Sequence, residues 1–220
     1  MKSVYFGKIQ PEHVIIIDKE LSRSSNESLF YLGPRPLGTC YGEIIEENNF
    51  SIYDLETNEF IGIGGLGPDG YNTIQHSLYI CKDQRRKGYG AAVIIKILKE
   101  QFETTPAERS RIIVYESNEA SLDLHQKMGY ATEAALRNYI MIDGKLCSLY
   151  YLVVDKKEHE KAVKQYITME KVKAENKDLA IARAAGDEAL KKVIKDHDIS
   201  EHQIERVLHG KDNNNSKSEN

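Results

Sequence analysis

Short apolar runs separated by polar or glycine-rich stretches fill the first part of the chain. The run Val14–Ile17 follows Pro11, a residue that favours the first turn of a helix, so a short helix is expected there. Thr39 is suited to cap a second helix, and the Ser-, Gly- and Pro-rich stretch before it indicates a loop. The predicted order is a strand over 4–9, a helix over 11–21, a loop over 22–38 and a helix over 39–47.

Strand patterns alternate with two helical patterns along the middle of the chain. Residues 112–114 form a continuous apolar run, which is typical of a central strand buried on both faces. Gly129 stands where a helix would end, and Asp143-Gly144 is a strong signal for a two-residue hairpin turn. The predicted strands cover 50–55, 60–66, 73–81, 111–116, 130–142 and 145–154, and the predicted helices cover 91–102 and 118–128. This succession predicts an α/β protein with a mixed sheet.

Charged residues become dense after residue 154, with 14 cations and 14 anions that cancel. An apolar stripe at helical spacing predicts a helix over 158–185, and Gly186 ends it. Asp187 and Ser200 are suited to begin two shorter helices. The predicted organisation is a domain over 1–154, a charged helical extension over 155–210 and a disordered polar tail over 211–220.

The overall composition limits the class of protein. A chain of 220 residues with 40% hydrophobic residues can bury one domain core, and its net charge of −4 argues against a general nucleic-acid binder. Cys40, Cys81 and Cys147 form no C-x-x-C pair, which indicates a reducing compartment without disulfides or zinc. The start of the chain lacks a signal-peptide core, and no apolar run approaches membrane length. A soluble, cytoplasmic, metal-free protein is expected.

A basic, glycine-containing turn joins the predicted strand over 73–81 to the next helix, and the chemistry of the chain is expected there. A helix that begins in such a turn presents free N–H groups and the positive end of its dipole. Gly88 and Gly90 would let a phosphate approach the backbone. Positive charge at the same place comes from Arg85, Arg86 and Lys87. These features predict capture of a pyrophosphate.

Two nucleotide motifs do not account for this turn. A P-loop is absent from the sequence. The G-x-G-x-x-G match at Gly62–Gly67 is followed by turn residues rather than a helix, so we interpret it as the end of a strand and its turn.

The pattern Arg85-x-x-Gly88-x-Gly90, between a strand and a helix, resembles the acetyl-CoA signature of the GNAT acetyltransferase superfamily. The resemblance covers residues 1–154 and implies the GNAT fold, a mixed, mostly antiparallel twisted sheet with flanking helices. Gly129-Tyr130, Asp143-Gly-Lys145 and the final strand look most like the subgroup that acetylates ribosomal-protein N-termini and polyamines. That subgroup often carries Asp where this chain has Ser148.

The resemblance implies acetyl-CoA as cosubstrate and assigns residues to it. Backbone N–H groups of residues 86–91 would bind the pyrophosphate, and the preceding strand would pair with the pantetheine arm. Asn118 would bond to the same arm, cap the following helix, or do both. The implied cofactor residues are Leu78, Tyr79, Ile80, Arg85, Arg86, Lys87, Gly88, Tyr89, Gly90, Ala91 and Asn118.

Acyl transfer needs a neutral amine, although a lysine-type amine has a pKa of about 10.4 in water. The family often places a Tyr acid where this chain has His125, which either protonates the leaving thiolate or is a polar flank of its helix. The position of the family's general-base Glu matches Gln75, which cannot take a proton at neutral pH. Its neighbour His76 could act as a catalytic base, although alternation would direct it to the other side of the strand. Glu116 and Glu133 are weaker candidates, so a water chain without a single decisive base is the favoured hypothesis.

The first functional hypothesis is direct acetyl transfer to a primary amine, either a protein N-terminus or lysine, or a polyamine-like molecule. Acidic residues near the predicted acceptor side suit a cationic substrate, or else form a solvated helix face; they are Glu43, Glu46 and Glu47. The alternative is a non-catalytic acetyl-CoA-binding regulatory module whose C-terminal helices contact DNA or a protein partner. Glu201 and Glu205 in the neutral extension disfavour DNA. Packing of the extension on the enzyme or on a second subunit, as in a homodimer, is the simpler interpretation.

Overall fold

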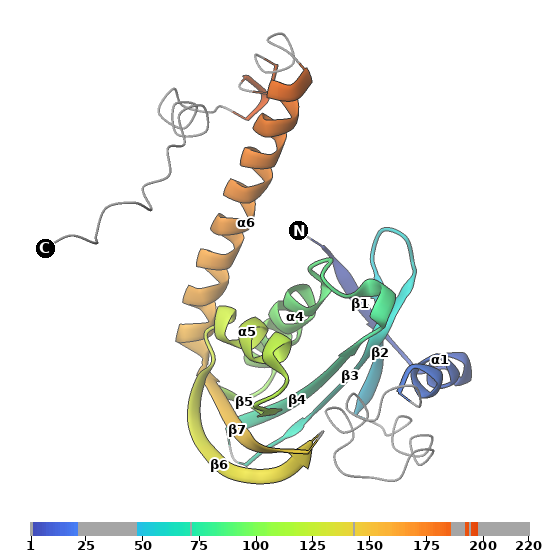
Figure 1. Ribbon diagram of the computed structural model, residues 1–220, viewed down its shortest axis with the longest axis vertical. Coiled ribbons are helices and arrows are strands. Elements are labelled where there is room, and N and C mark those ends of the chain that lie inside the picture. Colours follow the sequence, from blue (N-terminus) through green and yellow to red (C-terminus); the bar gives the residue numbers. More distant parts are fainter. Residues whose placement is uncertain are drawn as a thin grey trace, which may run out of the picture. The chain divides into compact units, whose positions relative to one another are not determined.

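The computed structural model describes residues 2–21, 48–70, 72–142, 144–185, 192–193 and 195–197 (Figure 1). Several predicted features therefore lie outside the described residues. They are the loop over 22–38, the helix over 39–47 with Glu43, Glu46 and Glu47, the helix ending at Gly210 and the polar tail.

Every strand and helix that the sequence predicts within the described ranges is present, with boundaries within two residues of those expected. The strands are β1 (Val4–Gly7), β2 (Asn49–Asp54), β3 (Phe60–Pro68), β4 (Thr73–Ile80), β5 (Arg109–Tyr115), β6 (Ala131–Ile142) and β7 (Lys145–Asp155). The helices are α1 (Pro11–Leu21), the 3₁₀ turn η1 (Lys82–Gln84), α4 (Tyr89–Thr104), α5 (Glu119–Lys127) and α6 (Lys156–Ala185).

The strands form one seven-stranded sheet in the order β1-β2-β3-β4-β5-β7-β6. Only β4 and β5 run parallel, and every other neighbouring pair is antiparallel. The predicted mixed, mostly antiparallel sheet is confirmed. Gly62–Gly67 lies at the end of a strand, as predicted, but the turn comes later than expected, because β3 stays paired with β4 from Gly62 to Pro68.

The two faces of the sheet carry separate hydrophobic clusters. On one face, buried residues of α4 such as Ile94 and Leu98 pack against Ile112 and Leu152 of the sheet. On the other face, α1 packs its buried apolar side against Ile63 of β3. The helices therefore cover opposite sides of the sheet, as Figure 1 shows.

The chain divides into two compact units, residues 1–166 and 167–220. The described part of the second unit is the remainder of α6 and a few later residues. In this unit Nε2 of His197 lies 3.4 Å from Oδ2 of Asp178. The domain boundary expected at residue 154 coincides with the junction of β7 and α6 and stays a prediction. None of the helices that the model describes is long and apolar enough to cross a bilayer.

Two leucines of β7 provide a matched test of where the core lies. Leu152 is fully buried, whereas Leu146 on the same strand is 56% exposed. Leu152→Ala is expected to lower the free energy of unfolding by about 2–5 kcal/mol, because it leaves a cavity in a packed core. Leu146→Ala should change it by less than about 0.5 kcal/mol. Urea denaturation of both variants measures this, and equal losses would contradict the placement of the core.

Candidate active site

The two parallel strands at the centre of the sheet are paired only where they begin. Thr73, Ile74 and Gln75 of β4 pair with 109–111 of β5, and no pair follows between these fully described strands. Yet β4 continues to Ile80 and β5 to Tyr115. Over this length the two strands are not paired with each other, and we call it the opening between β4 and β5. Backbone groups that face such an opening are suited to pair with an extended molecule.

The alternation of the strand decides which groups of β4 face this opening. The N–H of Cys81 donates to the carbonyl of Ile61 in β3, so Tyr79 also directs its backbone toward β3. Leu78 and Ile80 therefore direct their N–H and C=O groups toward β5. The carbonyl of Ile80 accepts from Nε of Arg85 at 2.9 Å, which closes the far end of the opening.

Tyr79 differs from its two neighbours in β4. Its buried side chain packs with α1, and its hydroxyl donates to Glu20 at 2.9 Å. The guanidinium of Arg85 lies 5.3 Å from the centre of the Tyr79 ring. Of the three β4 residues that the resemblance assigns to the pantetheine arm, Leu78 and Ile80 thus have the suitable backbone direction and Tyr79 does not.

The turn at the end of the opening leads into α4 with an unusual backbone. Arg86 has φ 61° and Gly88, the N-cap, has φ 89°. The first helical hydrogen bond runs from the N–H of Ala92 to Gly88, so the preceding N–H groups of α4 are not used within the helix. A Cβ added to Gly88 would meet nothing within 4 Å. Such a turn is an accessible, positively polarised site for an anion.

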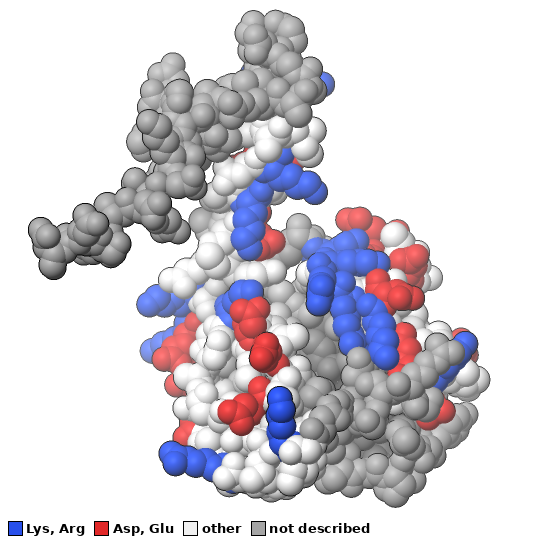
Figure 2. Space-filling model, in the orientation of Figure 1, with Lys and Arg blue, Asp and Glu red and all other residues white. Residues whose placement is uncertain are grey.

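Cationic side chains surround this turn. The exposed cations of the segment are Lys82, Arg85, Arg86 and Lys87, and Figure 2 shows Lys and Arg side chains gathered over the connection between β4 and α4. Lys87 is anchored locally, because its Nζ donates to Gln84 at 3.0 Å. Exposed cations raise the local concentration of an anionic ligand even where they do not contact it.

Gly90 plays a part that the sequence analysis did not anticipate. A Cβ at this position would lie 2.8 Å from the side chain of Leu124 in α5. Gly90 therefore permits the close approach of two helices. That Gly90 also lets a phosphate approach the backbone stays a prediction.

Asn118 lies just beyond β5 and caps α5. Its Oδ1 accepts from the N–H of Ser121 at 3.2 Å, so the predicted capping role is confirmed. Capping uses only the carbonyl oxygen of the side chain. The Nδ2 group carries two further donor hydrogens beside the opening, and a bond from Nδ2 to the pantetheine arm stays a prediction.

A buried hydrogen-bonded chain lies beneath the point where β4 and β5 part. The hydroxyl of Tyr130 donates to Oγ of Ser110 at 2.7 Å, and Oγ of Ser110 lies 3.4 Å from Nδ1 of His76. Nε2 of His76 then lies 3.3 Å from Nε2 of His125. Nδ1 of His125 lies 2.7 Å from the carbonyl oxygen of Ser121.

These contacts define the tautomers of both imidazoles when both rings are neutral. The carbonyl of Ser121 can only accept, so Nδ1 of His125 carries a proton, and Nε2 of a neutral His125 accepts. Nε2 of His76 then donates, and Nδ1 of His76 accepts from Ser110. A proton added to Nε2 of His125 would require His76 to change tautomer and to donate from Nδ1 to Ser110. Every ring nitrogen thus has a partner when both histidines are neutral.

Burial reinforces this neutral state. It lowers the pKa of His125 to about 4 and places the pKa of His76 well below the ordinary histidine value. His125 is 5% exposed, so its interpretation as a solvated polar flank of α5 is wrong. The hypothesis that an imidazolium at this position donates a proton at neutral pH does not fit the lowered pKa either. His76 faces away from Gln75, as predicted.

The two candidate carboxylate bases are occupied by other contacts. Glu116 accepts from the N–H of Ser148 at 3.0 Å and from the hydroxyl of Tyr150 at 3.1 Å. These bonds lower the pKa of Glu116, the backbone bond most, and so weaken it as a base. Glu133 forms an ion pair with Arg109 at 3.0 Å. Among the described residues, no three His, Cys, Asp or Glu side chains gather as metal ligands would.

The sheet with parted central strands, together with an anion-binding helix N-terminus at the end of the opening, defines the fold of coenzyme A-dependent acetyltransferases. The chain belongs to the GNAT acetyltransferase family, whose model matches residues 19–130, just over half of the chain. It is an N-acetyltransferase, and acetyl-CoA is its cosubstrate.

Individual relatives agree with this assignment. The chain is 28% identical over 142 residues to an uncharacterized N-acetyltransferase of the SPbeta prophage of Bacillus subtilis (strain 168), covering 62% of this chain and 80% of that protein. Among solved structures, spermidine N-acetyltransferase from Vibrio cholerae in complex with CoA and spermine has a TM-score of 0.58 at 16% identity, covering 71% and 98%. A GNAT-family acetyltransferase from Bacillus anthracis has a TM-score of 0.59 at 15% identity, covering 71% and 99%. Both structures show the same fold.

The buried histidines predict a loss of stability in acid. Unfolded histidines have pKa values near 6.5, so stability is complete above about pH 6.5 and is lost as pH falls toward the folded pKa, which is about 4 for His125. His125 alone should contribute a loss of about 3 kcal/mol over this interval. Urea denaturation between pH 7.5 and 4 measures it. His125→Gln, which keeps an acceptor for His76, should flatten the profile, and an unchanged slope would contradict the neutral pair.

Gly88 and Gly70 provide a test of the anion site. Both have positive φ, at 89° and 100°, and at both an added Cβ would meet nothing within 4 Å. Replacement by Ala therefore strains the backbone similarly in both. Gly88→Ala is expected to weaken acetyl-CoA binding about tenfold or more, because it disturbs the N–H groups of the turn, whereas Gly70→Ala should leave the Kd unchanged. Calorimetry with acetyl-CoA decides, and equal losses would argue against a site at this turn.

Proposed function

We propose that this enzyme transfers the acetyl group of acetyl-CoA directly to a primary amine of a cationic acceptor, either a protein N-terminus or lysine, or a polyamine-like molecule. The observation that carries the proposal is the opening between β4 and β5, which ends at the basic turn before α4. An extended cosubstrate lying in this opening would have its pyrophosphate at the turn and its thioester near the parting of the strands. A structural neighbour bound CoA and spermine, which supports an amine acceptor.

In this proposal each part of the cosubstrate has a partner. The N–H groups of residues 88–91 hold the pyrophosphate, and the exposed cations attract it. The backbone of Leu78 and Ile80 and the Nδ2 group of Asn118 hold the pantetheine arm. These contacts fix the thioester against an incoming amine and so supply the proximity term of catalysis.

The reaction itself makes modest demands on acid catalysis. The neutral amine attacks the thioester carbon, the C–S bond breaks, the sulfur leaves as a thiolate and the amine proton passes to water. A thiol of this kind has a pKa of about 8.5, so its thiolate leaves readily near neutral pH. A neutral His125 is compatible with that. We propose that His125 and His76 contribute to the reaction by orienting the elements around the opening and do not donate a net proton.

Glu116 supports a positively charged acceptor. The related subgroup often carries a carboxylate where this chain has Ser148, and Glu116 places its carboxylate against the N–H of Ser148. The lowered pKa keeps that carboxylate ionised at neutral pH. Glu116 is exposed and lies two residues before Asn118, at the end of β5. We propose that this charge takes over the attraction of an ammonium group to the acceptor side.

The cysteines bear on the compartment in which the protein acts. Cys81 and Cys147 are free and buried, which supports a reducing compartment, and we propose the cytoplasm.

A thiol-release assay with a panel of amines tests the proposed function. The panel contains spermidine, spermine, a peptide with a free N-terminus, a lysine peptide with a blocked N-terminus and an uncharged aliphatic amide as control. At least one amine should release CoA above the rate of acetyl-CoA hydrolysis. Glu116→Gln should lower kcat/KM for that amine about tenfold, as expected on losing a charged contact. Tight acetyl-CoA binding without release for any amine would overturn the proposal.

A further inference from the structure

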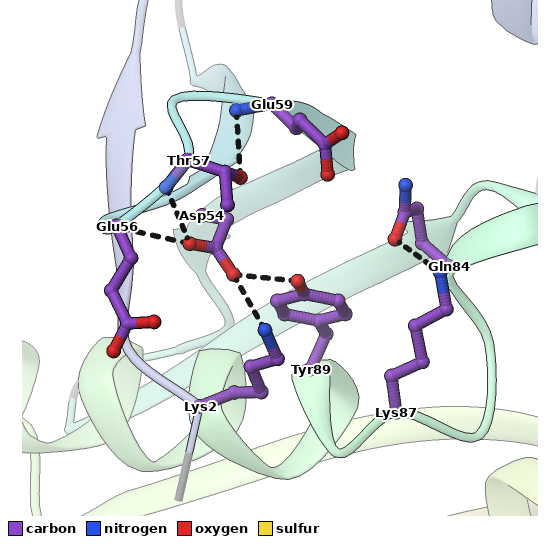
Figure 3. A network of polar contacts seen from close by, with 8 residues as sticks. All are labelled: Lys2, Asp54, Glu56, Thr57, Glu59, Gln84, Lys87 and Tyr89. Carbon is purple, nitrogen blue, oxygen red and sulfur yellow. Dashed lines mark hydrogen bonds and ion pairs between the residues drawn. The ribbon is translucent and has the colours of Figure 1, made fainter.

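A buried carboxylate lies behind the first turn of α4, in contact with residues from three separate parts of the chain (Figure 3). Asp54 ends β2 and is 1% exposed. Its Oδ2 accepts from the hydroxyl of Tyr89 at 2.6 Å and from Nζ of Lys2 at 3.0 Å. Its Oδ1 accepts from the backbone N–H groups of Glu56 and Thr57 at 2.8 and 3.0 Å. Asp54 thus ties the β2–β3 turn to α4.

Tyr89 is the first residue of α4 and directly follows the N-cap Gly88. Its ring is 3% exposed, and burial and the bond to Asp54 raise the pKa of its hydroxyl, which therefore stays a donor. The backbone N–H of Tyr89 belongs to the group that faces the pyrophosphate side. Holding the ring therefore also holds the N–H groups of Gly88 and Gly90 beside it.

The turn needs such support because its backbone is strained. Arg86 has a positive φ of 61°, a conformation that is strained in a residue other than glycine and persists only where the surroundings hold it. Two contacts hold the turn from the strand side: Arg85 to the carbonyl of Ile80, and Lys87 to Gln84. The bond from Tyr89 to Asp54 holds it from the helix side.

Lys2 balances the buried charge. Its ammonium pairs with Asp54 at 3.0 Å and lies 5.0 Å from the centre of the Tyr89 ring. Hydrogen bonds, the one from Tyr89 first, lower the pKa of Asp54, so the carboxylate stays ionised at neutral pH. Without Lys2, an uncompensated negative charge would lie behind a site for an anion, and the ion pair removes that repulsion.

We propose that Asp54 and Tyr89, with Lys2 as counter-ion, are positioning residues that hold the first turn of α4 in the geometry required by the pyrophosphate of coenzyme A. Neither side chain touches the cosubstrate in this proposal; both act through the N–H groups of the turn. The proposal rests on the cofactor part of the proposed function and not on the identity of the acceptor.

The test measures equilibrium binding, so it is independent of whether an acceptor amine has been found. Tyr89→Phe removes the hydroxyl and keeps the ring, and Asp54→Asn keeps the shape of the acceptor. Each variant is titrated with acetyl-CoA and with S-acetylpantetheine, which lacks the pyrophosphate and adenosine. The Kd for acetyl-CoA should rise about tenfold, as expected for losing one well-placed hydrogen bond, while the Kd for S-acetylpantetheine, measured by ligand NMR, stays within twofold.

Two controls separate positioning from general damage to the fold. Tyr5→Phe removes a phenol hydrogen bond to Asn58 on the outside of the same turn and should leave both Kd values unchanged. The double variant Asp54→Asn/Tyr89→Phe should bind acetyl-CoA about as well as the weaker single variant, because both changes remove one shared contact. Thermal unfolding first checks that all variants are folded. Additive losses of affinity in the double variant, equal losses of affinity for both ligands, or an unchanged Kd for acetyl-CoA would each overturn the proposal.

Discussion

Separation of two parallel strands after three paired residues is the constraint on which this structure depends. An unpaired backbone edge inside a sheet is costly unless water or a ligand satisfies it. We propose that in this chain the edge is a binding surface. The N-terminus of α4 lies at the far end of β4, and Asn118 lies at the end of β5. In this proposal each element contributes backbone or side-chain donors to the same opening.

The buried chain through Ser110, His76 and His125 lies where the strands still touch. Ser110 is paired with Ile74, and His76 follows the last paired residue of β4. A hydrogen bond between side chains of the two strands therefore accompanies the last backbone pairs. Because every donor has an acceptor, this polar group is compatible with a dry core, and each imidazole has one defined tautomer. An added proton would require His76 to change tautomer and would place a charge in this buried group, which burial disfavours. A reaction that releases a stable thiolate therefore suits this arrangement better than one that needs a strong acid.

The sequence was sufficient for the local elements and for locating the basic turn before α4, and insufficient for contacts between distant residues. Alternation and helical spacing are local properties, so they located β4, α4 and β5 and placed His76 opposite Gln75. These patterns predict which face of a strand or helix a residue occupies, but not which side chains it contacts there. The contacts between His76 and His125 and between Tyr89 and Asp54 join residues 49 and 35 positions apart. The packing role of Gly90 was missed for the same reason, because Leu124 lies on another helix.

Two kinds of positive potential meet at the turn before α4, and they differ in what they can achieve. The exposed side chains of Arg85, Arg86 and Lys87 act through solvent, where salt at physiological concentration screens them within about 8 Å. They speed the encounter with any anion and discriminate little. The backbone N–H groups are fixed in direction by the helix, so they favour an anion whose oxygens match their geometry. Selectivity for a pyrophosphate therefore depends on the rigidity of the turn, and hence on the buried contacts behind it, more than on the number of cations around it.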